Sequence, residues 1–500
     1  MKTKPKLLFW VNNFFLHFSL AYFIQSHLDV DFFGVIDTNS KPKIFYQNQT
    51  LVKFNKIWFF HDHIKRVQKY DADYLINFEK KYGIGLWKLA INERFFYLHN
   101  RFYKFKRHEI LSILEQESKL FESIIDEIKP DYFLTYDPVF HHQKLLLEMC
   151  QVKGIKVLCI CGTGEKNKYV IAENGATLDL DKNPSLISST NEVPLTATNT
   201  TYDQIFRKYM TNRETNFLNK FQALKDYLID SDSELIESNF MYYGRTKFKV
   251  IKDALSLEIK RKLNYSFLKK HSSLSPDLKT PFIYFPMNVN EELNLLHYAP
   301  YYTDQIEVIR NIAKSIPINY VLYVKEHIIA GMRGWNNINY YKEIMEMPNV
   351  VLINPAYDND LLIKNSDLVI TIRGTSSLKA IQNCKPSIIF GEQPIQIMPS
   401  IFKVTSLDSL PELIKTALKH KTDPSDYEKY KKILNDRAFE LDFFQFENNR
   451  DKMFLSGRIF SNVLISNNDM IDFLNENKKL LLPVLEAHLK IMNQTTIPLK

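Results

Sequence analysis

The chain has 500 residues, more than one hydrophobic core usually holds, so two domains are predicted. Because 45% of the residues are hydrophobic and 24% are charged, the composition is that of a globular protein. Its 65 basic and 57 acidic side chains leave a net charge of +8 without any arginine-rich tract, which argues against a nucleic-acid partner. No uninterrupted apolar run reaches about 18 residues, so no membrane-spanning helix is predicted.

The first third of the chain alternates between strand and helix patterns, as in an α/β domain. The predicted elements are a strand at 7–11, a helix at 14–26, strands at 31–36, 43–46 and 57–60, helices near 72–100 and 108–128, a strand at 132–136, a helix at 141–152 and a strand at 156–161. Asp37 and Asp137 therefore stand at the carboxyl ends of predicted strands, where open parallel sheets bind ligands.

The middle of the chain is less regular, and the second α/β pattern begins after it. Residues 176–201 are polar and predict a surface loop, residues 202–270 predict charged helices, and residues 272–280 predict a linker. Nearly continuous β-branched runs then predict a parallel sheet covered on both faces. Its expected strands are 282–285, 320–324, 350–353, 368–372 and 387–390, and residues 425–500 read as mostly helical.

The turn Gly374-Thr375-Ser376-Ser377 leaves one of these strands and opens a helix. Unpaired main-chain amides and the positive end of the helix dipole make such a turn an anion site. The alternative is that Thr375 or Ser376 merely caps the helix.

Five further residues of the second half stand beside predicted strand ends or in the adjoining loops. Lys325 and His327 end the strand from residue 320, where a charge and a hydrogen-bond donor would both suit a phosphate. Arg333 would complete a cationic rim or is a solvated loop residue. Asn288 and Glu292, just past the strand at 282–285, are placed to meet a ribose, a base or a sugar, or are ordinary loop residues.

No metal site is predicted. Cys159-x-Cys161 places two thiols on one face of a strand, but no second ligand pair follows in the sequence. We expect buried, reduced thiols of a cytoplasmic protein. His61-Asp62-His63 is interpreted as a solvated turn.

Six motifs in the second half, over about residues 281–395, resemble the bacterial capsular polysaccharide biosynthesis proteins. That group is similar to the Kdo transferases of capsule assembly, and more remotely to the sialyltransferase and epimerase branches of the GT-B fold. The motifs are Tyr284-Phe285-Pro286 with Glu292, Leu322-Tyr323-Val324-Lys325-Glu326-His327, Pro348-Asn349-Val350, Ile363-Lys364-Asn365-Ser366-Asp367, Gly374-Thr375-Ser376-Ser377, and Lys385-Pro386-Ser387 to Gly391.

The resemblance implies a GT-B-like α/β protein with two facing Rossmann-like domains, helical insertions and a helical C-terminal tail. The implied parts are residues 1–175, an acceptor domain; 176–275, a polar loop and helical insertion; 276–424, a nucleotide-sugar-binding domain; and 425–500, helices packing back across the domains. It also implies metal-independent transfer without a cofactor. The family's phosphate contacts map onto His327, Gly374, Thr375 and Ser376, and Ser377 completes that turn.

Three positions depart from the family pattern. Ile328 stands where proline is usual, Lys379 where a glutamate usually follows the Gly-Thr turn, and Asn288 where histidine is frequent. Lys379 would bind the donor diphosphate instead of sugar hydroxyls, or it marks a member that has lost activity.

The leading hypothesis is a glycosyltransferase that moves a sugar from a nucleotide-activated donor to a surface glycan or lipid-linked acceptor. His327 would stabilise the leaving phosphate, and Asp137, or next Asp37, would deprotonate the acceptor. The alternatives are a nucleotide-sugar epimerase of the same fold and a catalytically inactive glycan-assembly protein. The expected location is the cytoplasm, with or without peripheral contact at the inner face of the membrane.

Overall fold

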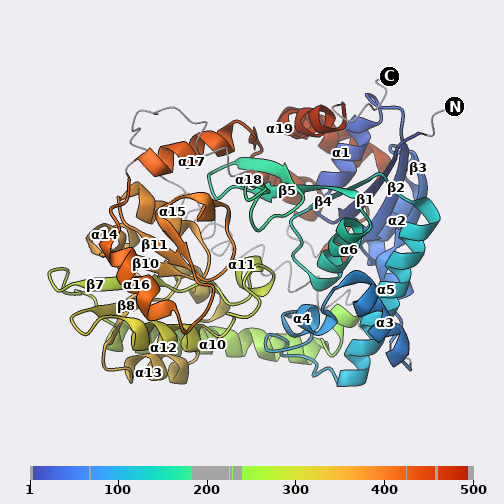
Figure 1. Ribbon diagram of the computed structural model, residues 1–500. Helices are drawn as coiled ribbons and strands as arrows, with labels where there is room; N and C mark the ends of the chain where they lie inside the picture. The colour runs from blue at the N-terminus through green and yellow to red at the C-terminus, as the bar shows by residue number, and fades with distance from the viewer. Residues whose placement is uncertain are drawn as a thin grey trace. The chain divides into compact units, whose positions relative to one another are not determined.

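The computed structural model describes residues 4–66, 69–182, 225, 228, 239–423, 425–456 and 460–493. These residues fall into two compact units, each built on its own sheet (Figure 1). The first unit holds the described residues up to Gly175, those between 198 and 250, and those from Arg437 onward. The second holds residues 176–182 and the described part of Ile251–Asp436. Most of the predicted polar loop and the first part of the predicted charged helices lie outside the described residues.

The first unit forms, within its described residues, a seven-stranded sheet in the order β13-β6-β5-β4-β1-β2-β3. Strands β1 to β5 run parallel, whereas β6 is antiparallel to both of its neighbours, β5 and β13. The chain therefore moves outward from β1 through β2 to β3 and then returns to the other side of β1 as β4. The strands are β1 Lys6–Asn12, β2 Asp31–Asp37, β3 Phe54–Phe59, β4 Tyr132–Tyr136, β5 Lys156–Gly162, β6 Lys168–Ala172 and β13 Phe439–Glu440.

Both faces of the first sheet are covered by helices, because β1 is apolar on both faces from Leu7 to Val11. Leu7 and Phe9 point into a core shared with α1 and α19, and Trp10 packs on the other face against Phe121 of α5. The helices are α1 Leu16–Ile24, α2 Ser40–Asn48, α3 Ala72–Tyr82, α4 Leu86–Ile91, α5 Arg107–Ile128, α6 His141–Val152, α18 Phe443–Arg450 and α19 Asn467–Asn493.

The strand predicted at 43–46 is wrong, since these residues belong to helix α2. A short apolar run does not separate strand from buried helix. Here Pro42 fits the first turn of a helix, and Phe45 and Tyr46 both turn toward Phe18 of α1.

The second unit holds a six-stranded sheet, among its described residues, in the order β12-β11-β10-β7-β8-β9, and all its strands are parallel. All five predicted strands are present within a residue or two of their expected ends. The strands are β7 Phe282–Pro286, β8 Val321–Lys325, β9 Val350–Ile353, β10 Leu368–Thr371, β11 Ser387–Ile389 and β12 Ile401–Lys403. Counted from β7, this is the 3-2-1-4-5-6 order of the doubly wound Rossmann fold.

Helices cover both faces of the second sheet as well (Figure 1). Helices α12, α13 and α16 contribute to one core, and α14 and α15 pack on the opposite face. Asp304 caps α12, because its carboxylate accepts hydrogen bonds from two first-turn amides. The helices are α10 Lys247–His271, α11 Leu293–Leu296, α12 Gln305–Ser315, α13 Ile338–Met345, α14 Asn359–Asn365, α15 Thr375–Gln382, α16 Leu410–Lys419 and α17 Ser425–Asn435.

The predicted α/β class with two Rossmann-like sheets is confirmed by these strand orders. In each sheet the strand order reverses at one place, between β1 and β4 in the first and between β7 and β10 in the second. Open α/β sheets bind ligands outside the carboxyl ends of the strands at such a switch point. Within the described residues, no helix is long and apolar enough to cross a membrane.

Candidate functional site

Three neighbouring strand ends meet at the switch point of the second sheet. Strand β7 pairs with β10 on one side and β8 on the other, with Tyr284 opposite Val369 and Pro286 opposite Lys325. Extending both registers past the strand ends places Asn288 level with Arg373 and with His327. The side-chain amide of Asn288 donates to the Arg373 carbonyl, which links the end of β7 to the end of β10. Since adjacent strands lie about 4.8 Å apart, the backbones at His327 and Arg373 are roughly 10 Å apart, with the end of β7 at Asn288 between them. This separation between the two outer strand ends is called the gap below.

The start of α15 forms one side of this gap. Gly374 adopts φ 154° and ψ 176°, a backbone conformation that favours glycine, and no side chain caps the helix at this residue. The Gly374 amide donates to Gln393 Oε1 at 3.2 Å, and Ser377 Oγ donates to the Gly374 carbonyl at 2.8 Å. Ser377 is buried and holds the turn from inside, whereas Thr375 is exposed and Ser376 is half-buried. The first-turn amides therefore have no side-chain cap and lie beside an exposed residue, which is the geometry that anion sites at helix starts use.

His327 forms the other side of the gap. Its Nδ1 accepts a hydrogen bond from the Ile329 amide at 3.3 Å, so the proton of the neutral ring resides on Nε2, which is a donor. The preceding Glu326 is buried and accepts from Asn336 at 2.7 Å and Tyr341 at 2.9 Å. Burial raises the pKa of Glu326, although these hydrogen bonds oppose the rise. The turn that carries His327 is thus held by a buried network.

Three predicted cations are engaged with partners within the second unit. Lys325 is buried, and its Nζ donates to Asn359 Oδ1 at 2.7 Å. Arg333 pairs with Glu291 at 3.0 Å. Lys379 pairs with Asp360 of α14 at 2.9 Å. Each of these three side chains is therefore engaged in an ion pair or a hydrogen bond within the protein.

Glu292 and Asn288 remain beside the gap. Glu292 precedes α11, its side chain is 40% exposed, and its Oε1 lies 4.0 Å from Arg333 Nη2. Asn288 is partly buried, and its Oδ1 has no hydrogen-bond partner within the described residues.

Arg373 was not selected as a site residue from the sequence, although it lies two residues past the end of strand β10 and directly before Gly374. It is 9% exposed, and its guanidinium lies 3.9 Å from the ring centroid of Tyr298. A cation held over an aromatic face directly before the Gly374 turn adds positive potential to the switch point. The sequence signal was present: one arginine between an apolar strand and a glycine.

The switch point of the first sheet also carries polar side chains. Asn12 at the end of β1 and Gln143 of α6 both donate to Tyr136 Oη at 2.8 Å. Asp137 follows β4 directly and is partly exposed, as the prediction of a base at a strand end requires.

Asp37, the second predicted base, is buried between two histidines. Its Oδ1 lies 3.0 Å from His61 Nε2, and its Oδ2 lies 3.7 Å from His142 Nε2 and 3.4 Å from Gln143 Nε2. Burial alone would raise the pKa of Asp37, but the nearby His142 and the hydrogen-bonded His61 outweigh burial and hold that pKa below its ordinary value. The interpretation of His61 as part of a solvated turn is wrong, because its ring is 9% exposed and faces this carboxylate.

A second buried network adjoins Asp37. His141 Nδ1 lies 2.9 Å from Glu93 Oε2, and its Nε2 lies 2.9 Å from Glu117 Oε2. Burial alone would lower the pKa of His141, but Glu117 and Glu93 outweigh burial and raise that pKa to about 10. Burial would likewise raise the pKa of Glu93, which the bond to His141 lowers to about 2. His141 is therefore a buried imidazolium between two carboxylates.

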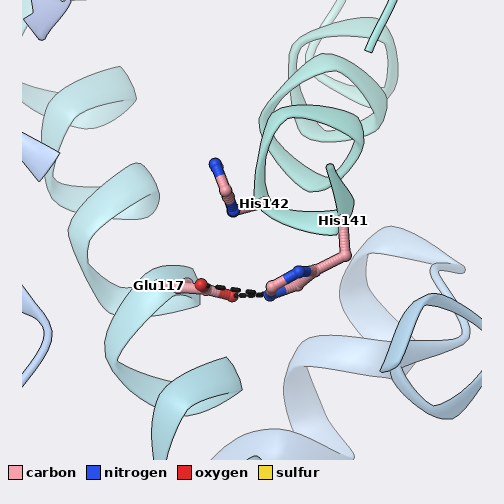
Figure 2. Close-up of side chains that lie close together, drawn as sticks. All are labelled: Glu117, His141 and His142. Carbon is pink, nitrogen blue, oxygen red and sulfur yellow. Dashed lines mark hydrogen bonds and ion pairs between the residues drawn. The ribbon is translucent and has the colours of Figure 1, made fainter. Parts of the chain in front are cut away.

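Glu117, His141 and His142 have the spacing of a metal site but do not fit a metal ion. Figure 2 shows the His141 ring bonded to Glu117 while His142 lies apart, without a bond to either. Both nitrogens of His141 are occupied by carboxylates, and a protonated ring has no lone pair for a metal.

Comparisons with known proteins were made for the whole chain. No family model and no curated protein sequence matches it. Among solved structures, the β-Kdo 2,7-transferase of KpsC from Thermosulfurimonas dismutans is 12% identical, with a TM-score of 0.31 over 79% of this chain and 97% of its own. The β-Kdo 2,4-transferase of the same KpsC is 8% identical, with a TM-score of 0.29 over 69% and 88% of the two chains.

A UDP-GlcNAc 2-epimerase from Methanocaldococcus jannaschii is 13% identical, with a TM-score of 0.24 over 86% of this chain and 99% of its own. The Kdo transferases are the group that the sequence motifs resemble. Because all three TM-scores lie under 0.5, the proposals below rest on the residues of this chain.

Proposed function

We propose that the chain is a GT-B-type glycosyltransferase and that the switch point of its second sheet binds the phosphates of a nucleotide-activated sugar. The observation that carries this proposal is the gap between the uncapped start of α15 and the Nε2–H of His327, with buried Arg373 beside it. Helix amides and a histidine donor are suited to a phosphate, and the cation adds to the field that attracts it.

In this proposal, transfer breaks the bond between the sugar and the phosphate, and negative charge grows on the leaving phosphate. Donors already fixed in position stabilise that charge without reorganising, which is the main source of catalysis in such sites. The α15 amides and His327 take this role, and no metal ion is required for it. Arg373 contributes through its positive charge without contacting the phosphate, since its guanidinium is held over the ring of Tyr298.

The first unit supplies the proposed base. Asp137 is preferred to Asp37, because Asp37 is buried with both oxygens engaged, whereas Asp137 is partly exposed at its switch point. The acceptor in this proposal is a surface glycan or lipid-linked glycan, and the protein meets a lipid-linked acceptor at the inner face of the membrane.

The test is calorimetric titration of the full chain with UDP-, GDP-, CDP- and CMP-sugars, followed by turnover assays with and without glycan acceptors. We expect His327→Ala to raise the Kd of the donor about 10- to 100-fold, the loss of one hydrogen bond to a charged group. His420→Ala is the matched control, because His420 binds Ser400 just before β12, at the amino edge of the same sheet.

Three results would count against the proposal. Tight binding to none of these sugars would favour the inactive assembly protein. Epimerised product without acceptor would favour the epimerase. Equal donor binding by the His327→Ala and His420→Ala variants would remove His327 from the site.

A further inference from the structure

Two thiols and a carboxylate gather at the carboxyl end of the first sheet, beside its switch point. Cys159 and Cys161 occupy alternate positions of β5 and point to the same face, with their Sγ atoms 3.4 Å apart. Asp137 is held beside them, since its amide donates to the Ile160 carbonyl at 3.1 Å. One ligand atom from each of these three residues lies within 4.8 Å of the other two.

The spacing of the two thiols fits a metal ion better than a disulfide. Zinc–sulfur bonds of about 2.3 Å in a tetrahedral site set the two sulfurs about 3.8 Å apart, close to the 3.4 Å found here. A disulfide needs sulfurs about 2.05 Å apart, and positions two apart on a strand have Cα atoms roughly 6.6 Å apart, near the upper limit for such a bond. Both cysteines are reduced in the structure.

The three ligands also favour a particular class of cation, and an ion can reach them from solvent. Both thiols are fully buried, as structural thiolate ligands usually are, while Asp137 is partly exposed and the neighbouring Gly162 is exposed. Two sulfurs and one oxygen select soft or borderline cations such as Zn²⁺ and Cd²⁺ over Mg²⁺ or Ca²⁺. Since the protein supplies three ligands, a water molecule would complete a tetrahedral site.

We propose that Asp137, Cys159 and Cys161 form a binding site for one thiophilic divalent cation of the zinc class. Binding deprotonates both thiols and releases two protons to solvent, so that two thiolates and one carboxylate surround the ion. The two thiols could be recognised from the sequence as a pair on one strand face, but their third ligand could not, because Asp137 follows the neighbouring strand β4. Binding itself does not depend on the proposed transferase function. If that function holds, the ion also occupies the carboxylate of the proposed base and inhibits transfer.

The test uses the full chain with Cys384→Ser as background, since Cys384 is exposed and would bind the probe non-specifically. Cd²⁺ is titrated under reducing conditions, the thiolate-to-cadmium ultraviolet band is recorded, and Zn²⁺ is then added as competitor. We expect one Cd²⁺ per chain, displaced by Zn²⁺, with about two protons released per ion in weakly buffered solution.

Further substitutions in that background decide which residues bind. Cys159→Ser and Cys161→Ser should each weaken Cd²⁺ binding at least about 100-fold, since even outer-shell partners are worth 10- to 100-fold. Asp137→Asn, at the exposed rim, should weaken it about 10-fold while leaving the circular dichroism spectrum unchanged. Cys150→Ser removes a buried thiol of α6 and should leave the band intact.

Absence of the band, release of no protons, or equal binding after Asp137→Asn would each overturn the site. The proton count needs no variant at the ligands, so it decides the question even if a serine variant fails to fold. Loss of donor binding in the His327→Ala variant leaves this test unaffected, so the two proposals fail separately.

Discussion

The buried ion cluster of Glu93, His141 and Glu117 allows a sharp prediction about stability. All three side chains are at most 2% exposed, and the imidazolium is the shared partner of both carboxylates. His141→Leu removes that partner and leaves two buried carboxylates facing each other. We expect the first unit to lose about 3–5 kcal/mol of unfolding free energy, the usual cost of breaking a buried ion pair.

The pKa of His141 gives an independent magnitude. Its rise from 6.5 to about 10 corresponds, at 1.36 kcal/mol per pKa unit, to on the order of 5 kcal/mol. The sign follows from linkage: a raised pKa contributes stability that is fully present below pH 6.5 and is lost as pH rises through about 10. The difference in unfolding free energy between wild type and the His141→Leu variant should therefore become smaller at alkaline pH.

The measurement is hydrogen exchange read by mass spectrometry on peptides of α5 and α6, because a chain of two units does not unfold in one step. His488→Leu is the matched control. His488 is fully buried in α19, and its Nδ1 is bonded to the Val484 carbonyl. Burial lowers the pKa of His488 to about 4, so its ring is neutral. The control should change stability by less than about 1 kcal/mol.

Equal stability of the His141→Leu and His488→Leu variants would refute the buried ion cluster. A gap between wild type and the His141→Leu variant that is constant from pH 6 to pH 10 would refute the assignment of the charge to His141.

The remaining predictions concern three single positions. Gly374→Ala should cost about 1–3 kcal/mol in the melting of the second unit and weaken donor binding, because the substituted residue strains at φ 154°. Asp37→Asn should cost on the order of 3 kcal/mol at neutral pH. Because the folded-state pKa of Asp37 lies below its ordinary 3.8, that stability is present above pH 3.8, and acid titration of the wild type should remove it. Lys379→Ala should change stability by less than about 1 kcal/mol and donor Kd by less than about twofold, because Lys379 is paired with Asp360 near the surface; thermal melting and calorimetry check both.

The second sheet was predictable because each of its strands is a short, nearly uniform apolar run between turn residues. In a parallel sheet covered on both faces such runs have few alternatives. Residues 43–46 do not form such a uniform apolar run between turn residues. They belong to helix α2, which packs against α1.

Long-range pairing explains most of what the sequence did not reveal. The partners of His141 are 24 and 48 positions away, and Asp37 and His61 are 24 apart. No periodic pattern links such residues, so a histidine that looks solvated from its neighbours can be buried against a carboxylate. The Asp137–Cys161 grouping depends likewise on the pairing of β4 with β5.

The most direct test of the central claim is a crystal structure of the chain soaked with the nucleotide-sugar that binds most tightly. The account predicts a phosphate within hydrogen-bond distance of the Thr375 and Ser376 amides and of His327 Nε2. A phosphate bound at the switch point of the first sheet, with the start of α15 unoccupied, would contradict it.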